Sequence, residues 1–287
     1  MPSPEAFLAA VVPEAKIQNV VSNRALQPPE PGEVAIKITA TAVNPVDWKM
    51  RDYNAFINEY PAVLGSDAPG QIVALWARRK YNSTFFQQYC KMPAVLVSKT
   101  PNNISDEQAA GVSLALVTSV TAFYDKKGHG LPPPWEKGGP QVERGKAVAI
   151  IGGASSVGQY AIQLARLSGF EKIVTNVSPE NHQFLKELGA HVVLDRARPS
   201  PEDFKAQSAG CRWTSCLMPS RLKTTAASEV VTVFVVHPEA IDPEAIEIKQ
   251  VLRIGGSPAL RYLSEPMAKH LGSEDGYIAK KNLFAVE

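Results

Sequence analysis

Alternating apolar positions mark the first part of the chain as rich in β-structure. Over residues 33–43 apolar side chains recur at every second position, with polar or small residues between them. This is the period of a half-buried strand. Further β-rich stretches follow at 70–75 and 94–99, and glycines and prolines punctuate the whole segment. The pattern predicts a mostly β domain over residues 1–127.

A helical pattern replaces the β pattern from Ser105 onward. Ser105 is followed three residues later by Gln108, the arrangement of a capping box at a helix start. The mainly apolar stretch that follows ends at Gly128. Residues 128–140 contain three consecutive prolines and several glycines, which cannot continue a helix. We expect a surface loop there.

Residues 147–195 have the pattern strand, helix, strand, helix, strand, with short turns between the elements. The expected strands are 147–151, 172–177 and 191–195. This order predicts an α/β fold with a doubly wound parallel sheet and right-handed crossovers, in a second domain over 128–287. Farther on, 229–236 reads as a strand and 258–272 as a helix.

Composition is that of a globular protein with little net charge. The chain has 287 residues, 45% of them hydrophobic, and a formal net charge of +2. That charge gives no basic field for nucleic acid or an anionic membrane. Apolar runs fall short of the roughly 18 residues of a membrane span, and no basic leader precedes the first one. The three scattered cysteines favour a reducing cytoplasm over a disulfide framework.

A glycine- and serine-rich turn joins the strand at 147–151 to the following helix. Such a turn exposes backbone N–H groups and the positive end of the helix dipole, which suits a phosphate. A Walker P-loop would need Lys and Ser or Thr where Gln159 and Tyr160 stand. A hydrolase elbow would need a second glycine where Val157 stands. Dinucleotide binding and a purely structural turn remain as interpretations, and the surrounding strand-helix pattern favours the former.

The tip of the second strand bears on the choice of dinucleotide. An acid about 20 residues past the turn would bind the ribose hydroxyls of NAD. Residues 175–178 read Thr-Asn-Val-Ser, with no acid. Ser178 and the following helix start can instead receive a 2′-phosphate, with Arg196 as the nearest basic candidate, although Glu180 lies close by. The residues favour NADP.

Several stretches in a shared order resemble the medium-chain dehydrogenase/reductase superfamily, in its zinc-independent quinone-oxidoreductase and fungal trans-acting enoyl-reductase (TOXD-like) branch. These stretches are NPVDWKM (44–50), VLGSDAPGQIV (63–73), LALVTSVTAFY (114–124), GLPPPW (130–135), GGASSVGQYAIQLA (152–165) and SPENHQFLKELGA (178–190). The resemblance implies a GroES-like catalytic domain, a Rossmann domain and NADPH as the cofactor.

The resemblance also assigns roles to individual positions. Residues matched to the segment beside the nicotinamide are Val46, Asp47, Trp48 and Lys49. Residues matched to the pyrophosphate turn are Ser155, Ser156, Val157 and Gly158, and the residues themselves indicate Gly152 and Gly153 as the glycines of the tight turn. Residues matched to the 2′-phosphate loop are Ser178, Pro179, Glu180 and Asn181, with Arg196 as the added basic candidate. Lys49, Thr118 and Tyr53 are the candidate catalytic residues.

Zinc ligands of the related zinc-dependent dehydrogenases are missing from the corresponding positions. No cysteine lies near Asn44, and Gly65-Ser66-Asp67 stands where a Gly-His-Glu triplet would be. A zinc Lewis-acid mechanism therefore lacks its ligands. Relative to the family the chain is also short near 76–82, and abbreviated past Cys211.

These observations lead to one expected function and two alternatives. The expected function is NADPH-dependent reduction of an activated C=C bond in an enoyl thioester, enone or quinone-like acceptor, in fungal secondary metabolism. The substrate would be a small molecule or an acyl group carried by a partner synthase, and the enzyme a cytoplasmic monomer or homodimer. One alternative is an NADPH-binding or partner-binding protein without catalysis. The other is a carbonyl or alcohol oxidoreductase.

Overall fold

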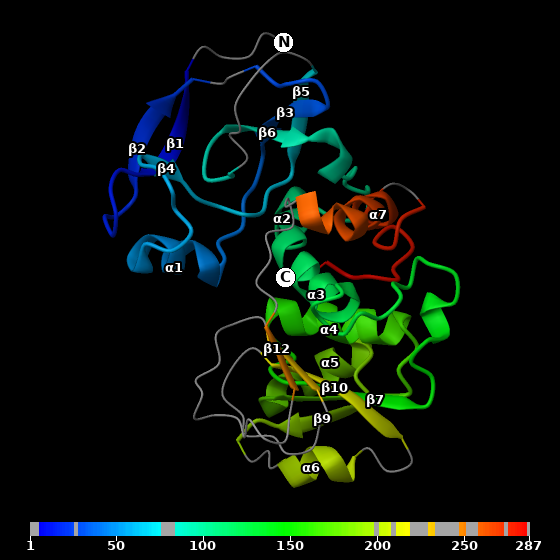
Figure 1. Cartoon of the computed structure of the whole chain (residues 1–287). Coiled ribbons are helices and arrows are strands. Elements are labelled where there is room, and N and C mark those ends of the chain that lie inside the picture. The colour runs from blue at the N-terminus through cyan, green and yellow to red at the C-terminus, as the bar shows by residue number, and fades with distance from the viewer. Residues whose placement is uncertain are drawn as a thin grey trace. The chain divides into compact units, whose positions relative to one another are not determined.

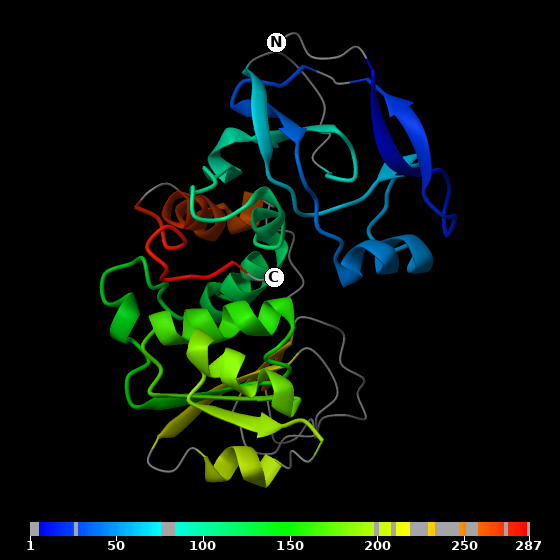
Figure 2. The same cartoon turned by 180° about the vertical axis from the view of Figure 1, so that it is seen from behind.

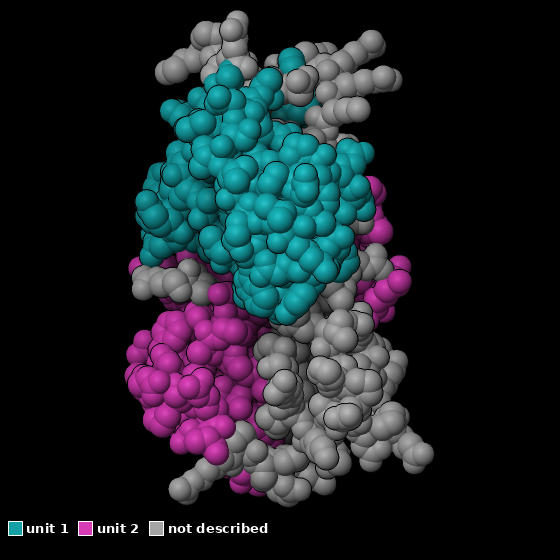
Figure 3. All heavy atoms as spheres, turned by 90° about the vertical axis from the view of Figure 1, so that its left-hand side faces the viewer, with its two compact units in different colours: residues 1–114, 271–279, 287 teal, residues 115–270, 280–286 magenta. Residues whose placement is uncertain are grey.

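The computed structural model describes residues 6–25, 28–75, 84–197, 201–207, 211–218, 229–232, 247–250, 258–272 and 275–285. The chain divides into two compact units, coloured separately in Figure 3. Unit 1 comprises Met1–Leu114 with Leu271–Ala279 and Glu287; unit 2 comprises Ala115–His270 with Lys280–Val286. The boundary at residue 127 between the expected catalytic domain and the expected Rossmann domain was drawn from sequence and is not the same as this division into compact units. That boundary stays a prediction.

Unit 1 is built on two small antiparallel sheets (Figure 1). The first has the order β2-β1-β4 and the second the order β5-β3-β6. Their strands are β1 (Phe7–Val12), β2 (Val20–Arg24), β3 (Glu33–Ile38), β4 (Ala62–Val63), β5 (Gly70–Leu75) and β6 (Tyr89–Pro93). The expected strands at the start of 33–43 and at 70–75 are confirmed as β3 and β5.

Each sheet of unit 1 has its own small apolar core. Residues buried against β3 are Val34, Ile36, Phe85 and Cys90. Residues buried against β1 are Ala9, Val11 and Val63, with Phe86 packed on them. In β1 burial follows the two faces of the strand, since Phe7, Ala9 and Val11 are buried while Leu8 on the other face is 47% exposed.

The expected strand at 94–99 is wrong. The strand of this region is β6, which pairs with β3 and ends where Glu33 lies opposite Pro93. Pro93 has no N–H with which to continue the ladder, and residues 94–96 form a 3₁₀ turn instead. The strand was hard to recognise because it contains Lys91, a buried lysine held 3.6 Å from Glu33.

Three helices complete the part of the chain up to Tyr124: α1 (Pro45–Tyr53), α2 (Asp106–Ala110) and α3 (Ser113–Tyr124). The capping box is confirmed, since the Gln108 N–H donates to Ser105 Oγ and the Ser105 N–H donates to Gln108 Oε1. The single helical stretch expected from Ser105 to Gly128 is divided at Gly111, the C-cap of α2.

The loop expected over 128–140 is confirmed, and residues 136–138 within it are exposed, but its middle is packed against the protein. Pro133 and Pro134 are buried. The Trp135 ring stands edge-on to Tyr124, with 5.6 Å between ring centroids. Prolines suit such a place because they bury an apolar ring and have no N–H donor to satisfy.

Unit 2 contains a parallel sheet of six strands in the order β12-β11-β10-β7-β8-β9. The strands are β7 (Lys146–Ile150), β8 (Lys172–Val177), β9 (Val192–Asp195), β10 (Arg212–Met218), β11 (Glu229–Thr232) and β12 (Glu247–Gln250). Counted from β7, this is the Rossmann order 3-2-1-4-5-6 read from the other edge. The expected doubly wound sheet is confirmed, and the order reverses beside β7. Of the strand expected at 229–236, residues 229–232 are β11 and the rest lies outside the described residues.

Unit 2 also contains the helices α4 (Ser156–Leu167), α5 (His182–Leu188) and α6 (Pro201–Ala206). Helix α7 (Arg261–Leu271) lies in unit 2 except for its last residue. One face of α4 is buried at Ala161, Leu164 and Ala165. Residues 280–285 run beside α4 in both Figure 1 and Figure 2. Within the described residues, no helix is long and apolar enough to cross a membrane.

Candidate functional site

The turn after β7 is shaped by its glycines and by Ser155. Gly152 has a φ of +76°, a conformation that residues with a side chain rarely adopt. Ser155 is the N-cap of α4: its hydroxyl accepts from the Gly158 N–H at 3.1 Å and donates to the Gly152 carbonyl at 2.8 Å. The Ser155 hydroxyl therefore serves the turn itself.

Two other glycines leave no room for a side chain. A Cβ on Gly153 would meet Thr175 Oγ1 at 2.2 Å and Leu185 Cδ1 at 2.9 Å. A Cβ on Gly158 would meet the Gly152 carbonyl oxygen at 2.4 Å. At Gly153 a Cβ would displace side chains of β8 and α5, and at Gly158 it would displace the backbone of the turn, so both positions require glycine for the turn to pack this closely.

Three backbone donors of the turn have no hydrogen-bond partner in the part of the chain that the structure describes. The N–H groups of Ala154, Ser156 and Val157 make no hydrogen bond among the described residues, whereas those of Gly152, Ser155 and Gly158 do. Unpaired N–H groups at a helix start, reinforced by the helix dipole, form a site for an anion. This arrangement fits the pyrophosphate of a dinucleotide.

Asn176, which sequence reasoning did not select, holds the turn from the neighbouring strand. Its side-chain Oδ1 accepts from the Gly152 N–H at 2.9 Å, and its carbonyl accepts from the Gly153 N–H at 3.3 Å. Asn176 is only 5% exposed. In the sequence the tip of this strand is marked only by the lack of an acid. No local pattern indicates that an amide there reaches back to the turn.

Helix α3 contacts the same turn through Ser119. The single proton of the Ser119 hydroxyl has two acceptors within reach, the Val157 carbonyl at 2.9 Å and the Ala115 carbonyl at 3.1 Å. Ser119 follows the candidate catalytic residue Thr118, which is half-buried in α3. The helix that carries Thr118 is thus fastened to the first turn of α4.

The expected 2′-phosphate loop forms a 3₁₀ turn directly after β8, over Pro179–Asn181. Its side chains Pro179 and Glu180 are exposed, and Ser178 and Asn181 are half-buried. The Ser178 hydroxyl beside Glu180 is the main cause that lowers the pKa of that carboxyl, with Arg196 adding a smaller effect. Glu180 is therefore an anion at neutral pH, placed where a phosphate is expected.

Arg196 lies at the end of β9, beside the end of β8. Its N–H donates to the Val177 carbonyl at 3.0 Å, and its side chain is exposed. The structure thus brings Arg196 and Glu180 to the same sheet edge as the glycine turn, the carboxyl end of the parallel strands. Ligands of open α/β sheets bind at this end.

In unit 1, the candidate catalytic residues gather on α1. The Lys49 ammonium lies over the Trp48 ring, 5.6 Å from its centroid. The Trp48 and Tyr53 rings are 6.0 Å apart, and they are 42% and 67% exposed. Val46 is half-buried at the start of the helix. The surface of α1 therefore combines a cation with aromatic area.

Asp47 points inward and caps α1. Its Oδ2 accepts from the Asn44 N–H at 2.7 Å, and the residue is 2% exposed. Burial raises the pKa of the Asp47 carboxyl, and hydrogen bonds from Asn44, Gly65 and Ser66 offset this only in part. A second carboxyl, Asp67, is 1% exposed, and burial raises its pKa to about 6. The charge of Asp47 adds to that rise.

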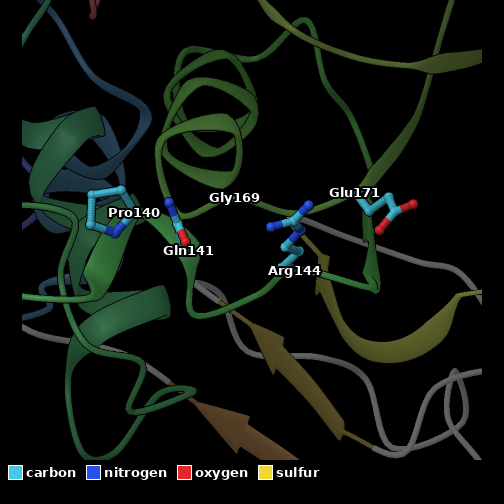
Figure 4. A pocket seen from close by; sticks show the side chains of 5 residues that line it. All are labelled: Pro140, Gln141, Arg144, Gly169 and Glu171. Carbon is cyan, nitrogen blue, oxygen red and sulfur yellow. The ribbon is translucent and has the colours of Figure 1, made fainter.

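A pocket of about 380 Å³ lies at the opposite edge of the sheet. It is lined by Pro140, Gln141, Arg144, Gly169 and Glu171, which precede the starts of β7 and β8 (Figure 4). This is the amino end of the strands, so the pocket is separate from the glycine turn. Among the described residues, no group of three or more His, Cys, Asp or Glu is arranged to hold a metal ion.

Sequence comparisons identify relatives of the chain. Residues 30–87 match the family of the alcohol dehydrogenase GroES-like domain. The trans-enoyl reductase himH of Aspergillus japonicus is 36% identical over 190 residues, which are 60% of this chain and 54% of that protein. The trans-enoyl reductase tazE of Aspergillus terreus is 33% identical, over 65% of this chain and 67% of that protein. The chain thus spans about half of the length of himH and two thirds of that of tazE.

Solved structures confirm the fold. An alcohol dehydrogenase superfamily protein from Novosphingobium aromaticivorans has a TM-score of 0.74 at 23% identity, over 96% of this chain and 88% of that one. The CurK enoyl reductase has a TM-score of 0.72 at 17% identity, over 99% and 91%. The N–H groups of the turn that are unpaired among the described residues fit the pyrophosphate of a nicotinamide cofactor. The chain belongs to the medium-chain dehydrogenase/reductase superfamily, in its trans-enoyl reductase branch.

Proposed function

We propose that this protein reduces an activated C=C bond of an enoyl thioester, enone or quinone-like acceptor with NADPH. The observation that carries the proposal is the set of three unpaired N–H groups at Ala154, Ser156 and Val157, directly after β7 where the strand order reverses. This is the place and the chemistry that a dinucleotide pyrophosphate requires. The family to which the chain belongs supplies the reaction class.

The residues of unit 2 would hold the cofactor along the carboxyl edge of the sheet. In this proposal the turn 152–158 binds the pyrophosphate, with Asn176 holding Gly152 in place. Ser178, Pro179, Glu180 and Asn181, with Arg196, surround the adenosine end. Val46, Asp47, Trp48 and Lys49 keep their proposed place beside the nicotinamide half, Asp47 through its capping of α1.

When bound, the cofactor supplies a hydride to the β-carbon of the acceptor. Negative charge then develops on the carbonyl oxygen and must be stabilised by a donor. Lys49, as an ammonium, and Thr118, as a hydroxyl, are the groups proposed for this role. Tyr53 or a water molecule delivers the proton to the α-carbon. The aromatic surface of Trp48 holds the Lys49 ammonium.

NADPH is proposed over NADH on the basis of two features of the strand tips. Residues 175–178 contain no acid to bind the ribose hydroxyls, and Arg196 lies beside the end of β8. Both features favour a 2′-phosphate. Glu180 opposes it, so the preference for NADPH is expected to be smaller than the arginine alone would give.

The relatives named trans-enoyl reductases support a setting in fungal secondary metabolism. The proposed substrate is a small enone or an acyl group carried by a partner synthase, and the enzyme acts as a monomer or homodimer in the cytoplasm. The alternatives, NADPH binding without catalysis and carbonyl reduction, stay predictions.

The test is NADPH consumption by the purified chain, followed by absorbance, with an enoyl thioester, an enone, a quinone and a saturated ketone. The expected result is consumption with the first three, and a saturated product in the case of the enoyl thioester. Lys49→Met is expected to lower kcat by about tenfold or more, whereas Lys37→Met, an exposed lysine on β3, is not. Binding without turnover would favour the non-catalytic alternative, and reduction of the ketone would favour the carbonyl alternative.

A further inference from the structure

Asp67 joins two segments of unit 1 that are distant in sequence. Its Oδ2 accepts from the Asn44 side-chain amide at 2.8 Å, and its Oδ1 accepts from the Leu114 N–H at 2.5 Å. Its backbone carbonyl accepts from the Thr41 hydroxyl at 2.7 Å. One buried residue therefore fastens the stretch 41–44 to the stretch that contains Leu114.

The fastened segments are the starts of two helices. Asn44 is the N-cap of α1, and Leu114 lies in the first turn of α3. The first N–H groups of a helix have no partner within the helix, so Asp67 completes α3 in the way that a capping residue would. It also holds Asn44 by its side chain, which sets where α1 begins.

No cation neutralises Asp67 among the described residues. The titratable group that faces it is Asp47 of α1, a like charge, and its other partners are an amide and a backbone N–H. Burying a carboxyl against another carboxyl opposes folding. A residue that served packing alone would not need a carboxyl group at this buried position. A residue that must accept two hydrogen bonds at once, from Asn44 and from Leu114, does need one.

We propose that Asp67 is a positioning residue for the reduction: by accepting from Asn44 and Leu114 it fixes the segment 44–49, which carries Trp48 and Lys49. This inference rests on the proposed function, which gives Lys49 its role in the reduction. Asp67 itself need not touch substrate or cofactor. Its effect is to hold α1 at one place, so that the Lys49 ammonium meets the developing negative charge in a fixed position.

The experiment compares the wild-type chain with Asp67→Ala, Asp67→Asn and Asp106→Ala, a control that removes an exposed carboxyl in the first turn of α2. Two readouts are taken on each protein. The first is amide hydrogen exchange of the peptides covering 44–50 and 113–118, without any ligand. The second is kcat and KM for NADPH with an enone acceptor.

The inference predicts that Asp67→Ala speeds exchange by about tenfold or more in both peptides, because the Leu114 N–H in 113–118 loses its buried acceptor and the segment 44–50 loses the bond that holds Asn44. It predicts a fall in kcat of similar size, with KM for NADPH changed by less than about threefold, since the turn 152–158 is untouched. Asp67→Asn keeps an acceptor for Leu114, and the Asn44 amide can turn to face it, so this variant is expected to retain wild-type exchange and most of kcat.

Unchanged exchange in Asp67→Ala would overturn the fastening, and faster exchange with an unchanged kcat would overturn the positioning role. If Asp67→Ala does not fold, Asn44→Ala gives the same test from the other end of the 2.8 Å bond. Failure of the proposed function has a different signature. The wild-type chain would then consume no NADPH with any acceptor, while the exchange difference between variants would still be measured.

Discussion

At the scale of single residues, the buried carboxyl of Asp67 makes stability depend on pH. Its pKa in the folded protein is about 6, above its ordinary value of 3.8, and burial is the main cause. Well below pH 3.8 the group is protonated in both the folded and the unfolded state, and its burial then carries no ionisation cost. Between pH 4 and 6 the unfolded chain has lost the proton while the folded protein still holds it, so rising pH favours the unfolded chain. The free energy of unfolding therefore falls as pH rises, until the folded pKa has been passed.

Asp67→Asn is therefore expected to become more stable relative to wild type as pH rises from 4 to 7. The difference in free energy of unfolding should grow by at most about 3 kcal/mol, since each pKa unit corresponds to about 1.4 kcal/mol. Urea unfolding of both proteins at pH 4, 5, 6 and 7 measures it. A difference that stays constant, or shrinks with pH, would contradict the buried carboxyl described here.

Glu180 is expected to weaken the binding of a 2′-phosphate. Glu180→Gln removes an exposed negative charge beside Ser178, so affinity for NADPH should rise by about two- to fivefold, with little change for NADH. Fluorescence titrations with both cofactors provide the measurement. Glu136→Gln, another exposed glutamate of unit 2, serves as the control. An equal rise for NADH would show that Glu180 does not face the 2′ position.

Some of these residues could be recognised from sequence and some could not. Gly152 and Gly158 were recognisable because a strand-turn-helix pattern demands small residues at those positions. Asp67 and Asn176 act through partners 47 and 24 residues away in the chain. A single sequence gives no signal for hydrogen bonds between segments so far apart, so both remained outside the candidate site.

At the scale of elements, the glycine turn depends on support from β8. Asn176→Ala would leave the N–H of the half-buried Gly152 without its acceptor, which costs about 1–3 kcal/mol. We expect a lower melting temperature and affinity for NADPH reduced by about tenfold. Calorimetry and cofactor titration test this, with Asn23→Ala, an exposed asparagine on β2, as the control. Wild-type affinity in Asn176→Ala would mean that the turn holds its shape alone.

Elements with strong local patterns were predicted well. The capping box at Ser105 and the strand 172–177 were found because their signals lie within a few residues. The strand β6 was missed because Lys91 occupies a buried position that only its partner Glu33 explains. The division between α2 and α3 at Gly111 was also missed, since one glycine within a helical pattern is ambiguous.

At the scale of the whole molecule, the chain crosses between its two units several times. Residues 271–279 return to unit 1, and residues 280–286 then return to unit 2. The last segment is anchored on α4, where Gln163 Oε1 accepts from the Phe284 N–H at 2.6 Å and Gln163 Nε2 donates to the Phe284 carbonyl at 3.3 Å. Gln163 is fully buried.

This anchor is expected to contribute to the stability of unit 2. Gln163→Ala removes both bonds to Phe284 and leaves that backbone unpaired, so the free energy of unfolding should fall by about 1–3 kcal/mol. Gln183→Ala, an exposed glutamine of α5 bonded to Glu187, is the control and should change little. A thermal melt of each variant decides the matter: equal melting temperatures would show that the segment does not support α4.

The sheet order could be predicted only in part. The βαβαβ pattern of 147–195 implied that β7, β8 and β9 lie side by side, and they do. The places of β10 and β12 could not be derived, because short strands such as Glu247–Gln250 carry too little pattern to be recognised. The return of residues 271–279 to unit 1 has no local signal at all.

A fluorescence titration with NADPH tests whether the glycine turn 152–158 binds the dinucleotide. The purified wild-type chain is compared with Gly158→Ala and Arg144→Ala. The account predicts saturable binding to wild type and to Arg144→Ala, whose arginine lines the pocket at the opposite sheet edge. Gly158→Ala should bind at least about tenfold more weakly, because its Cβ would meet the Gly152 carbonyl at 2.4 Å. No binding to wild type, or equal binding to Gly158→Ala, would contradict it.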